Sequence, residues 1–485
     1  LPGACGIGDL GEGARLFVDW LAKGGQKWWQ VLPLGLPGEK DFDIPYYPQS
    51  SWAGSPLYVS FEELYKAGDL STAELEAAKV PPSDRIRYAA VKASRRRLLP
   101  KAAERFFKRD DPGEIDRFKK FCRQEKYWLD NWALFAAVKK LFPGRPWWRW
   151  PKGLCLRDPQ ALKDFSREYA ELIRIEKYIQ FRFFEQWDRL RAYARQKGVK
   201  LIGDVPVYCA HDSADVWAHR SMFKVDRRGR ALKVGGVPPD YFSRTGQLWG
   251  NPVYDWRANR ADGFRWWIAR LKGCLRTVDV VRVDHFLGFN AYYEISARAK
   301  TAINGRWVKG PGDALFKAIF RALGEVPFIA EDLGVITPEV IKLRERWRLP
   351  GMRVLQFAFG GDPKNNIHLP IWHVPHSVVY PGTHDNDTSV GWYHSASPAE
   401  RKAFRRYTGS DGRRPHQEML RLAYASVANL AIVPMQDVLG LGSSARINTP
   451  GVLKPNFNYL WKLKPSQLRS KDAAFLRGMV EIYGR

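Results

Sequence analysis

Carboxylate side chains follow three of the apolar segments of this sequence. Asp284, Glu331 and Asp385 each come shortly after a run of Val, Ile, Phe or Tyr. An ionised carboxylate at the end of a buried strand loses solvation, so each one needs a reason to be there. For a single residue, capping the following helix explains the position as well as chemistry does. Three such residues at one edge of a sheet favour a shared chemical role.

A set of closely spaced carboxylates is what cleavage of a glycosidic bond requires. One carboxyl group stays protonated and donates its proton to the leaving oxygen, while an ionised one attacks or stabilises the anomeric carbon. Neighbouring carboxylates separate their pKa values, because two like charges disfavour joint ionisation. The sequence therefore predicts glycosidic chemistry, with Asp284, Glu331 and Asp385 as the catalytic residues.

Three polar neighbours of these carboxylates are candidate binding residues. Arg282 precedes Asp284 by two positions, and its charge could hold that carboxylate ionised; the alternative is a salt bridge between two strands. His285 and His384 each adjoin a predicted catalytic Asp and could donate hydrogen bonds to sugar hydroxyls. A single His is more often a core residue, so their adjacency to the carboxylates is what supports both.

Seven short apolar runs supply the strands that must position these side chains. They are rich in β-branched or aromatic residues, and helical patterns lie between most of them, which is typical of buried parallel strands in an α/β fold. The runs are residues 28–33, 200–204, 278–283, 326–330, 352–359, 377–380 and 430–434. Seven strands are one short of a closed ring, so we predict a (β/α)8 TIM barrel with one strand missing and with the carboxylates at the carboxyl ends of its strands.

Two stretches interrupt this alternation. Residues 56–195 are rich in Glu, Lys, Arg, Ala and Leu, and we interpret them as a mainly helical insertion. Residues 208–260 are rich in Pro, Gly and Asp, and we interpret them as a loop subdomain over the active-site face, because long loops in compact domains are usually functional. Both stretches belong to one catalytic barrel that spans residues 1–485.

The composition and charge of the chain limit the classes of partner that we expect it to bind. Lys and Arg number 78 against 51 Asp and Glu, a net charge of +27 that can attract nucleic acid. The densest basic group, between Arg95 and Arg109, has the spacing of a solvated helix face, so we expect no nucleic-acid partner. No apolar run reaches the roughly 20 residues of a membrane helix, so we expect no membrane partner. Five scattered cysteines indicate a reducing compartment.

Seven motifs resemble, in the same order, those of the 4-α-glucanotransferases, the family also called amylomaltase or disproportionating enzyme and grouped as glycoside hydrolase family 77. They are GDVPVY (203–208), HDSADVWA (211–218), VPPDYFSRTGQLWGNP (237–252), VRVDHFLGF (281–289), AEDLGVITPEV (330–340), LPGMRVLQFAF (349–359) and GTHDNDT (382–388). The likeness runs from Leu1 to about Pro450. Residues 434–451 are especially similar to plastid and bacterial members.

The resemblance implies Asp284 as nucleophile, Glu331 as general acid and base, and Asp385 as stabiliser of the transition state. It implies a retaining double displacement on α-1,4-glucans through a covalent glucosyl–enzyme intermediate, with transfer to another sugar and with no cofactor or metal. The expected partners are maltodextrin, amylose or starch-derived α-glucans, bound by a monomer or weak homodimer. The expected location is cytoplasmic, or the plastid stroma in a plant or alga.

The same resemblance implies a set of substrate-binding residues. In the family, the loop that matches residues 241–249 overhangs the cleft and stacks aromatic side chains on glucose rings, which agrees with the fit of flat rings against the C–H faces of sugars. The substrate-binding residues that we predict are Arg282, His285, His384, Tyr241, Trp249, Asp240, Gln247, Asn251, Tyr47 and Asp204.

The sequence departs from the family pattern in several places. Members begin with an apolar strand before a motif that ends in Leu-Pro-Gly, whereas this chain opens at Leu1, and we expect the natural protein to carry that strand. Leu287 stands where the family has Arg, residues 371–372 replace His-Asn, and the donor-side loop at 46–50 carries an extra Pro. Residues 456–462 depart from an aromatic motif. Reduced or redirected activity is the expected consequence.

Two alternatives stay open. An α-glucan hydrolase would use the same residues and differ in its acceptor. A non-catalytic glucan-binding protein would keep the fold, but the three intact carboxylates argue against it. Products longer than the substrate separate transfer from hydrolysis.

Overall fold

A seven-stranded parallel sheet forms the centre of the chain, whose computed structural model describes all residues except 39–42, 240–242, 335, 453 and 455–456. The strands lie in the order β1-β2-β5-β8-β9-β10-β11, so neighbours in the sheet follow one another along the chain. They are β1 (Trp28–Gln30), β2 (Lys200–Val205), β5 (Val280–Val283), β8 (Phe328–Ala330), β9 (Gly351–Val354), β10 (Ser377–Tyr380) and β11 (Leu430–Ala431). Each predicted apolar run overlaps one of them, which confirms the predicted α/β barrel fold.

The sheet curls like a barrel with one strand position open. In the part of the chain that the structure describes, no strand pairs with both β11 and β1 to close the ring. A cavity of about 450 Å³ lies against residues of both strands, among them Trp28 and Ala431. Tyr380 on β10 donates a hydrogen bond to Gln30 Oε1 on β1 at 2.9 Å. The predicted absence of one barrel strand is therefore confirmed.

Side chains alternate between the interior of the barrel and the surrounding helices. Ile202, Ile329 and Met352 belong to a buried cluster of their own, formed by strand side chains inside the barrel. Val281 and Val283 instead join the large core that includes the helices. Because successive side chains of a strand point to opposite faces, Arg282 between them faces the interior.

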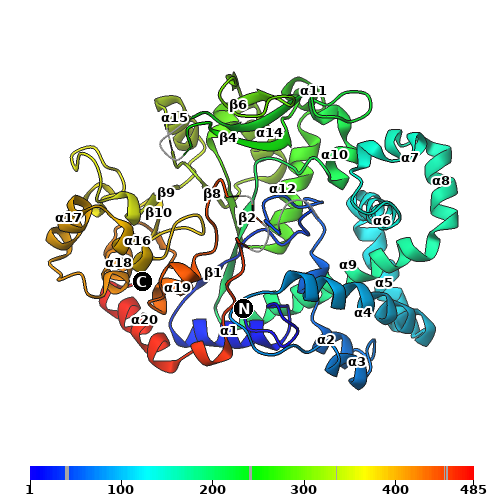
Figure 1. Ribbon diagram of the computed structural model, residues 1–485, viewed down its shortest axis with the longest axis horizontal. Coiled ribbons are helices and arrows are strands. Elements are labelled where there is room, and N and C mark those ends of the chain that lie inside the picture. Colours follow the sequence, from blue (N-terminus) through cyan, green and yellow to red (C-terminus); the bar gives the residue numbers. More distant parts are fainter. Residues whose placement is uncertain (39–42, 240–242, 335, 453, 455–456) are drawn as a thin grey trace.

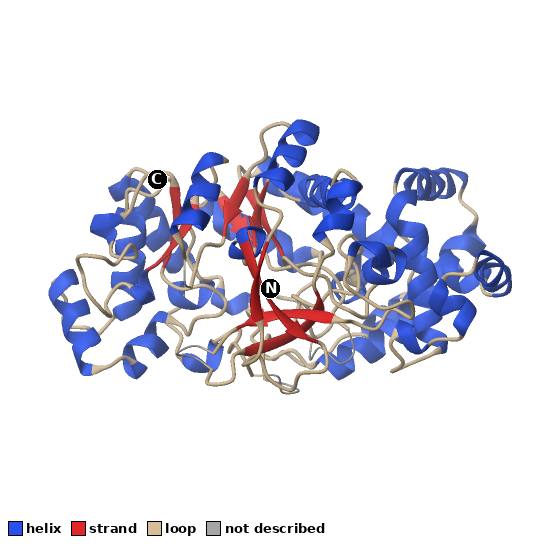
Figure 2. Cartoon of the chain, turned by 90° about the horizontal axis from the view of Figure 1, so that it is seen from above, coloured by secondary structure: helices blue, strands red, loops and turns tan. Residues whose placement is uncertain are grey.

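Helices cover the outer face of the sheet. The helix α1 shows why: Ala14, Phe17, Val18 and Leu21 are buried, which is the spacing of one face of an amphipathic helix. The covering helices include α1 (Glu12–Lys23), α9 (Ala170–Gln196), α12 (Arg265–Thr277), α14 (Asp313–Leu323), α15 (Pro338–Arg346), α18 (Pro415–Ala425) and α20 (Ser470–Tyr483). Figure 2 shows the strands in the middle of the molecule with helices on either side.

The residues between β1 and β2 are mostly helical. Residues 56–195 contain helices and no named strand, and Figure 1 shows α4 to α8 gathered on one side of the sheet. These helices are α2 (Phe61–Lys66), α3 (Thr72–Glu76), α4 (Tyr88–Arg109), α5 (Pro112–Gln124), α6 (Lys126–Leu141), α7 (Lys152–Leu156) and α8 (Pro159–Glu168). Shorter helices elsewhere are α10 (Ala214–Ala218), α11 (Trp256–Ala261), α13 (Leu287–Asn290), α16 (Ser389–Ser395), α17 (Pro398–Thr408) and α19 (Met435–Val438).

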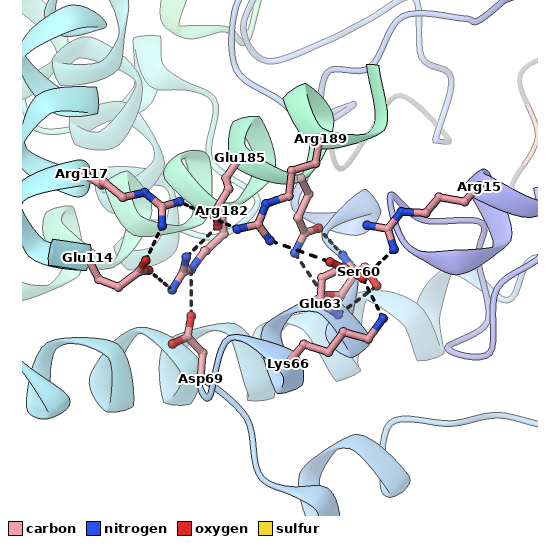
Figure 3. Close-up of polar contacts among 11 residues, drawn as sticks. Arg15, Ser60, Glu63, Lys66, Asp69, Glu114, Arg117, Arg182, Glu185 and Arg189 are labelled. Carbon is pink, nitrogen blue, oxygen red and sulfur yellow. Dashed lines mark hydrogen bonds and ion pairs between the residues drawn. The ribbon is translucent and has the colours of Figure 1, made fainter. Parts of the chain in front are cut away.

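Buried ion pairs connect the helices of this insertion (Figure 3). Arg182 on α9 donates from Nε to Asp69 Oδ2 at 2.8 Å and from Nη1 to Glu185 Oε2 at 2.7 Å, and its Nη2 lies 2.9 Å from Glu114 Oε2. Arg109 pairs with the other oxygen of Asp69 at 3.1 Å. Arg117 pairs with both Glu114 and Glu185. We call this set the Arg182 network: Asp69, Glu114 and Glu185 with Arg109, Arg117 and Arg182.

The basic side chains of helix α4 mostly lie on the solvated face that the sequence predicts, and Arg95 is the exception. Arg95 is buried, and its guanidinium group lies 3.8 Å from the ring centroid of Phe61. Arg105 pairs with Glu74 at 2.7 Å, and Arg109 belongs to the Arg182 network. Arg105 and Arg109 remain partly open to solvent although each has a partner on another segment, so only Arg95 departs from the predicted solvated face.

A second sheet of four antiparallel strands has the order β4-β3-β6-β7. Its strands are β3 (Lys233–Val237), β4 (Gln247–Pro252), β6 (Ala291–Ser296) and β7 (Arg306–Lys309). The sequence analysis did not predict these strands, because β3 is short and contains two glycines. Those glycines are needed: a Cβ at Gly236 would lie 2.1 Å from the backbone oxygen of Gln247 on β4.

No helix in the described residues is both long and apolar enough to cross a membrane.

Candidate active site

Two of the predicted catalytic residues continue the hydrogen-bond ladder of the barrel. Asp284 directly follows β5, and its N–H donates to Val205 O at 3.0 Å. Glu331 directly follows β8, and its N–H donates to Val283 O at 3.0 Å. The backbone of both residues is thereby fixed at the carboxyl ends of adjacent strands, which is where barrel enzymes place their catalytic groups.

Arg282 connects the predicted nucleophile to the interior of the barrel. Its Nη1 donates to both oxygens of Asp204 at 2.8 Å and to Asp284 Oδ1 at 2.9 Å. Asp204 and Arg282 are paired positions on β2 and β5, so the contact is a bridge between strands as well as a partner for Asp284. Arg282 therefore forms both contacts that were considered, the bridge between strands and the pair with Asp284. Burial alone lowers its pKa, but the charges of Asp204 and Asp284 raise it well above the usual value, so the guanidinium stays charged.

The pKa values of the two neighbouring carboxyls are raised to different extents. Burial raises the pKa of Asp284 to about 6, against the opposing effect of Arg282. Burial raises the pKa of Glu331 to about 8, again opposed by Arg282 and increased further by the charge of Asp284. The pKa of Glu331 is raised further than that of Asp284, so Glu331 is the carboxyl that keeps its proton to higher pH. A separated acid and base of this kind is what a two-carboxylate mechanism needs.

Backbone amides fix the orientation of the Glu331 carboxyl group. Its Oε2 accepts from the N–H of His285 at 2.7 Å, and its Oε1 accepts from the N–H of Leu333 at 3.0 Å. His285 has a φ of 50°, in the left-handed region that non-glycine residues rarely occupy. Such strain persists where the surrounding structure enforces it, often at functional sites. Burial lowers the pKa of the His285 side chain to about 4, so its ring is neutral.

The third predicted catalytic residue is held from a different direction. Asp385 Oδ1 accepts from Asn448 Nδ2 at 2.6 Å, and His384 Nε2 lies 3.3 Å from the same oxygen. Arg446 donates to the backbone oxygen of Asp385 at 2.7 Å. Sequence analysis did not identify Arg446 and Asn448 as positioning residues, although the 434–451 segment that contains them was noted for its similarity to family members. The charge of Asp385 also raises the pKa of Asp284, so the two carboxyls are close.

Tyr46 is a site residue that the sequence analysis missed. Its hydroxyl donates to Asp204 Oδ2 at 2.6 Å, and its ring stacks on that of His384 with centroids 5.0 Å apart. Tyr46 thus links the Arg282–Asp204 pair to the Asp385 segment. The predicted residue was its neighbour Tyr47, which is half-buried; two adjacent tyrosines in the loop gave no means of choosing between them.

The predicted binding loop lies partly on β4. Trp249 is half-buried, with its ring centroid 5.0 Å from that of His285, and Gln247 Oε1 accepts its Nε1–H at 3.2 Å. Asn251 is buried, and its Nδ2 donates to Cys209 O at 2.9 Å, so it bonds to the backbone of its own region. Asp240 and Tyr241 lie outside the described residues.

The residues that depart from the resemblance have diverse surroundings. Leu287 is buried at the start of α13. Ile371 and Trp372 are 74% and 48% exposed, so the substitution at these positions leaves apolar side chains in solvent.

Among the described residues, no group of three or more His, Cys, Asp or Glu side chains has an arrangement that could hold a metal ion.

Comparison with known proteins connects this geometry to one family. The model of glycoside hydrolase family 77, described as 4-alpha-glucanotransferase, matches residues 1–468. The 4-alpha-glucanotransferase of Thermus thermophilus is 45% identical over 100% of this chain and 97% of its own length. The chloroplastic/amyloplastic 4-alpha-glucanotransferase of Solanum tuberosum is 42% identical over 100% of this chain and 84% of its own length. The solved amylomaltase of Streptococcus agalactiae in complex with acarbose has a TM-score of 0.96 and 34% identity, covering 100% of this chain and 97% of that one.

Proposed function

This chain belongs to the 4-alpha-glucanotransferase family and has 4-α-glucanotransferase activity on α-glucans, and on that basis we propose that it transfers α-1,4-glucan segments between maltodextrins by a retaining double displacement. The observation that carries the proposal is the division between two adjacent carboxyls. Arg282 donates to Asp284, whereas Glu331, with the higher pKa, accepts hydrogen bonds only from backbone N–H groups within the part of the chain that the structure describes.

In the first step, Asp284 is the nucleophile and Glu331 is the acid. A carboxylate oxygen of Asp284 bonds to C1 of a glucosyl unit as the glycosidic C1–O bond breaks. The leaving oxygen takes the proton of Glu331, so the released glucan carries a new hydroxyl and Glu331 becomes a carboxylate. The glucan on the donor side remains attached to Asp284 as a β-linked ester.

In the second step the roles reverse. Glu331, now ionised, removes the proton from a hydroxyl of an acceptor glucan. The acceptor oxygen attacks C1 and displaces Asp284, which forms a new α-linkage and restores both carboxyls. Two inversions leave the anomeric configuration as it was in the donor.

The remaining polar residues support the charge that develops at C1. Asp385, held by Asn448 and His384, presents a carboxylate that stabilises an oxocarbenium-like transition state. Arg282 keeps Asp284 ionised until it attacks, and Asp204 and Tyr46 keep Arg282 in place. Trp249 beside His285 supplies an aromatic face for a glucose ring.

Incubation with maltotriose tests the proposal. We expect glucose and a ladder of maltodextrins longer than maltotriose, because the intermediate is released to sugar acceptors. An α-glucan hydrolase would yield no product longer than the substrate, and that outcome would refute transfer. Acarbose, the ligand in the Streptococcus agalactiae structure, should inhibit the reaction competitively.

A further inference from the structure

The segment that binds Asp385 also brings a tyrosine to the site. Arg446 and Asn448 both bond to Asp385, and a few residues later the N–H of Tyr459 donates to Ile447 O at 2.7 Å. The backbone oxygen of Tyr459 accepts from the hydroxyl of Tyr88 at 3.0 Å. The backbone of Tyr459 is therefore fixed on both sides.

The backbone conformation of Tyr459 is unusual. Its φ is 58°, in the left-handed region, which costs free energy for a residue with a Cβ. The preceding Asn458 helps to hold the turn, because its side chain accepts from the N–H of Thr449 at 2.9 Å and donates to Val452 O at 2.8 Å. The turn aims one aromatic side chain inward in a stretch that departs from the family pattern.

The hydroxyl of Tyr459 is buried and has no partner among the described residues. The residue is 7% exposed, and it lines the same cavity of about 450 Å³ as Arg282, Thr383 and His384. A buried hydroxyl without a hydrogen bond costs roughly 1–3 kcal/mol. Arg282 and His384, which line this cavity with Tyr459, contact the predicted catalytic residues Asp284 and Asp385. A buried polar group left in this state near them points to a ligand that supplies the missing bond.

The charges around the Tyr459 hydroxyl indicate which ligand this is. Burial raises the pKa of Tyr459 well above its usual value, and the charges of Asp385, Asp284 and Asp204 raise it further. The phenol is therefore a donor at every working pH, never a base. It lies near the carboxyls of Asp284 and Asp385, and a glucosyl unit bound to Asp284 presents hydroxyl oxygens that accept hydrogen bonds.

We propose that Tyr459 is a specificity-determining residue that donates a hydrogen bond to one ring hydroxyl of the glucosyl unit attached to Asp284. The proposal rests on the double displacement at Asp284 described above. A site built to bond a substrate hydroxyl rejects an analogue without it, because the protein group is again left unpaired. Tyr459 thus makes the enzyme select donors that carry this hydroxyl.

The test crosses the enzyme variant with the substrate variant. Wild type and Tyr459→Phe are compared on α-maltosyl fluoride and on its 2-deoxy, 3-deoxy and 6-deoxy analogues, modified in the glucosyl unit that carries fluoride. With the complete donor, Tyr459→Phe should lower kcat/KM by about 10- to 100-fold. One deoxy analogue should lower kcat/KM of the wild type similarly and leave little further loss in the variant. Tyr65→Phe removes the same oxygen from an exposed ring on α2 and should change nothing.

Two outcomes would overturn the inference. One is that the fold-loss in kcat/KM caused by Tyr459→Phe is the same on every deoxy analogue as on the complete donor. The Tyr459 hydroxyl would then bond to none of the three substrate hydroxyls. The other is a wild type that treats all the donors alike, a result that does not depend on how the variant folds. A failure of the proposed mechanism looks different. In that case the wild type, supplied with maltotriose, would form no maltodextrin that is longer than maltotriose.

Discussion

The molecule buries two clusters of carboxylates, and they differ in how many cations accompany them. In the Arg182 network, three carboxylates are matched by three arginines, and Arg189 pairs with Glu185 in addition (Figure 3). Asp69 alone bonds to both Arg182 and Arg109. In the active site, Asp204 and Asp284 share Arg282, and Arg446 bonds only to the backbone oxygen of Asp385. Among the described residues, no Lys or Arg forms an ion pair with the carboxyl of Glu331 or Asp385.

This difference appears in the protonation of the carboxyls. In the active site, burial raises the pKa values of Asp284 and Glu331, because one guanidinium does not offset the desolvation of both. Beside the Arg182 network, Glu63 has its pKa lowered: burial alone would raise it, but Arg15 and Lys66 bond to it and outweigh that effect. Full pairing keeps carboxylates inert and structural, whereas incomplete pairing leaves one of them able to carry a proton.

The largest expected effect concerns the nucleophile. Asp284→Asn should lower transferase activity by about 10⁴-fold, because an amide forms no glycosyl ester. The measurement is initial velocity on maltotriose, with acarbose binding as the control for an intact site. Residual activity above about one per cent of wild type would place the nucleophile elsewhere.

The Arg182 network should respond in stability and not in turnover. Arg182→Leu leaves Asp69 buried with a single remaining cation, so we expect the free energy of unfolding to fall by roughly 3–5 kcal/mol. Denaturant unfolding measures the loss, and kcat per folded molecule should stay within about twofold of wild type. An Arg182→Leu protein that is as stable as wild type but has a lower kcat would contradict the structural role given to the Arg182 network.

Replacing Glu331, the carboxyl whose pKa burial raises, should stabilise the protein. The folded-state pKa of Glu331, about 8, exceeds the unfolded value of about 4.5. The folded state therefore binds this proton more tightly, and the wild type loses stability as pH rises from about 4.5 to about 8. Glu331→Gln escapes that loss.

We expect Glu331→Gln and wild type to have similar stability at pH 4, and the variant to be more stable by roughly 1–3 kcal/mol at pH 8. Thermal unfolding across this range measures the difference. Equal stability at both pH values would mean that Glu331 carries no raised pKa, and a less stable variant at pH 8 would show the carboxylate to be favourably paired.

The smallest effect is expected at the solvent edge of the Arg182 network. Arg117 pairs with Glu114 and Glu185, but its side chain is 47% exposed. Arg117→Ala should therefore cost no more than about 1 kcal/mol of unfolding free energy in denaturant titration. A loss as large as that of Arg182→Leu would show that exposure does not rank the arginines of this network.

Local sequence patterns predicted the parts of this molecule that local interactions determine. The seven strands are short apolar runs, and a change from Val or Ile to Asp or Glu marks where a strand ends at the mouth of the barrel. Asp284 and Glu331 were located in this way. The glycine-containing strand β3 was missed because its register depends on a close approach of another strand and not on its own pattern.

Pairings over long sequence distances could not be predicted. Tyr46 and Asp204 are 158 positions apart, and Arg182 and Asp69 are 113 apart. No periodicity or motif records such contacts, which form only when the barrel brings its loops together. For the same reason, the burial of Arg95 and the partners of Arg105 and Arg109 could not be predicted from the basic stretch on α4.

In the proposed mechanism, Asp284 forms a covalent bond to the donor sugar while Glu331 donates and later accepts the proton. Glu331→Gln supplied with α-maltosyl fluoride tests it most directly, because fluoride leaves without acid assistance and release of the sugar then lacks its base. We predict a mass increase of one maltosyl unit, mapped by peptide fragmentation to Asp284. An adduct on another residue, or release of a β-configured product with no adduct, would contradict the account.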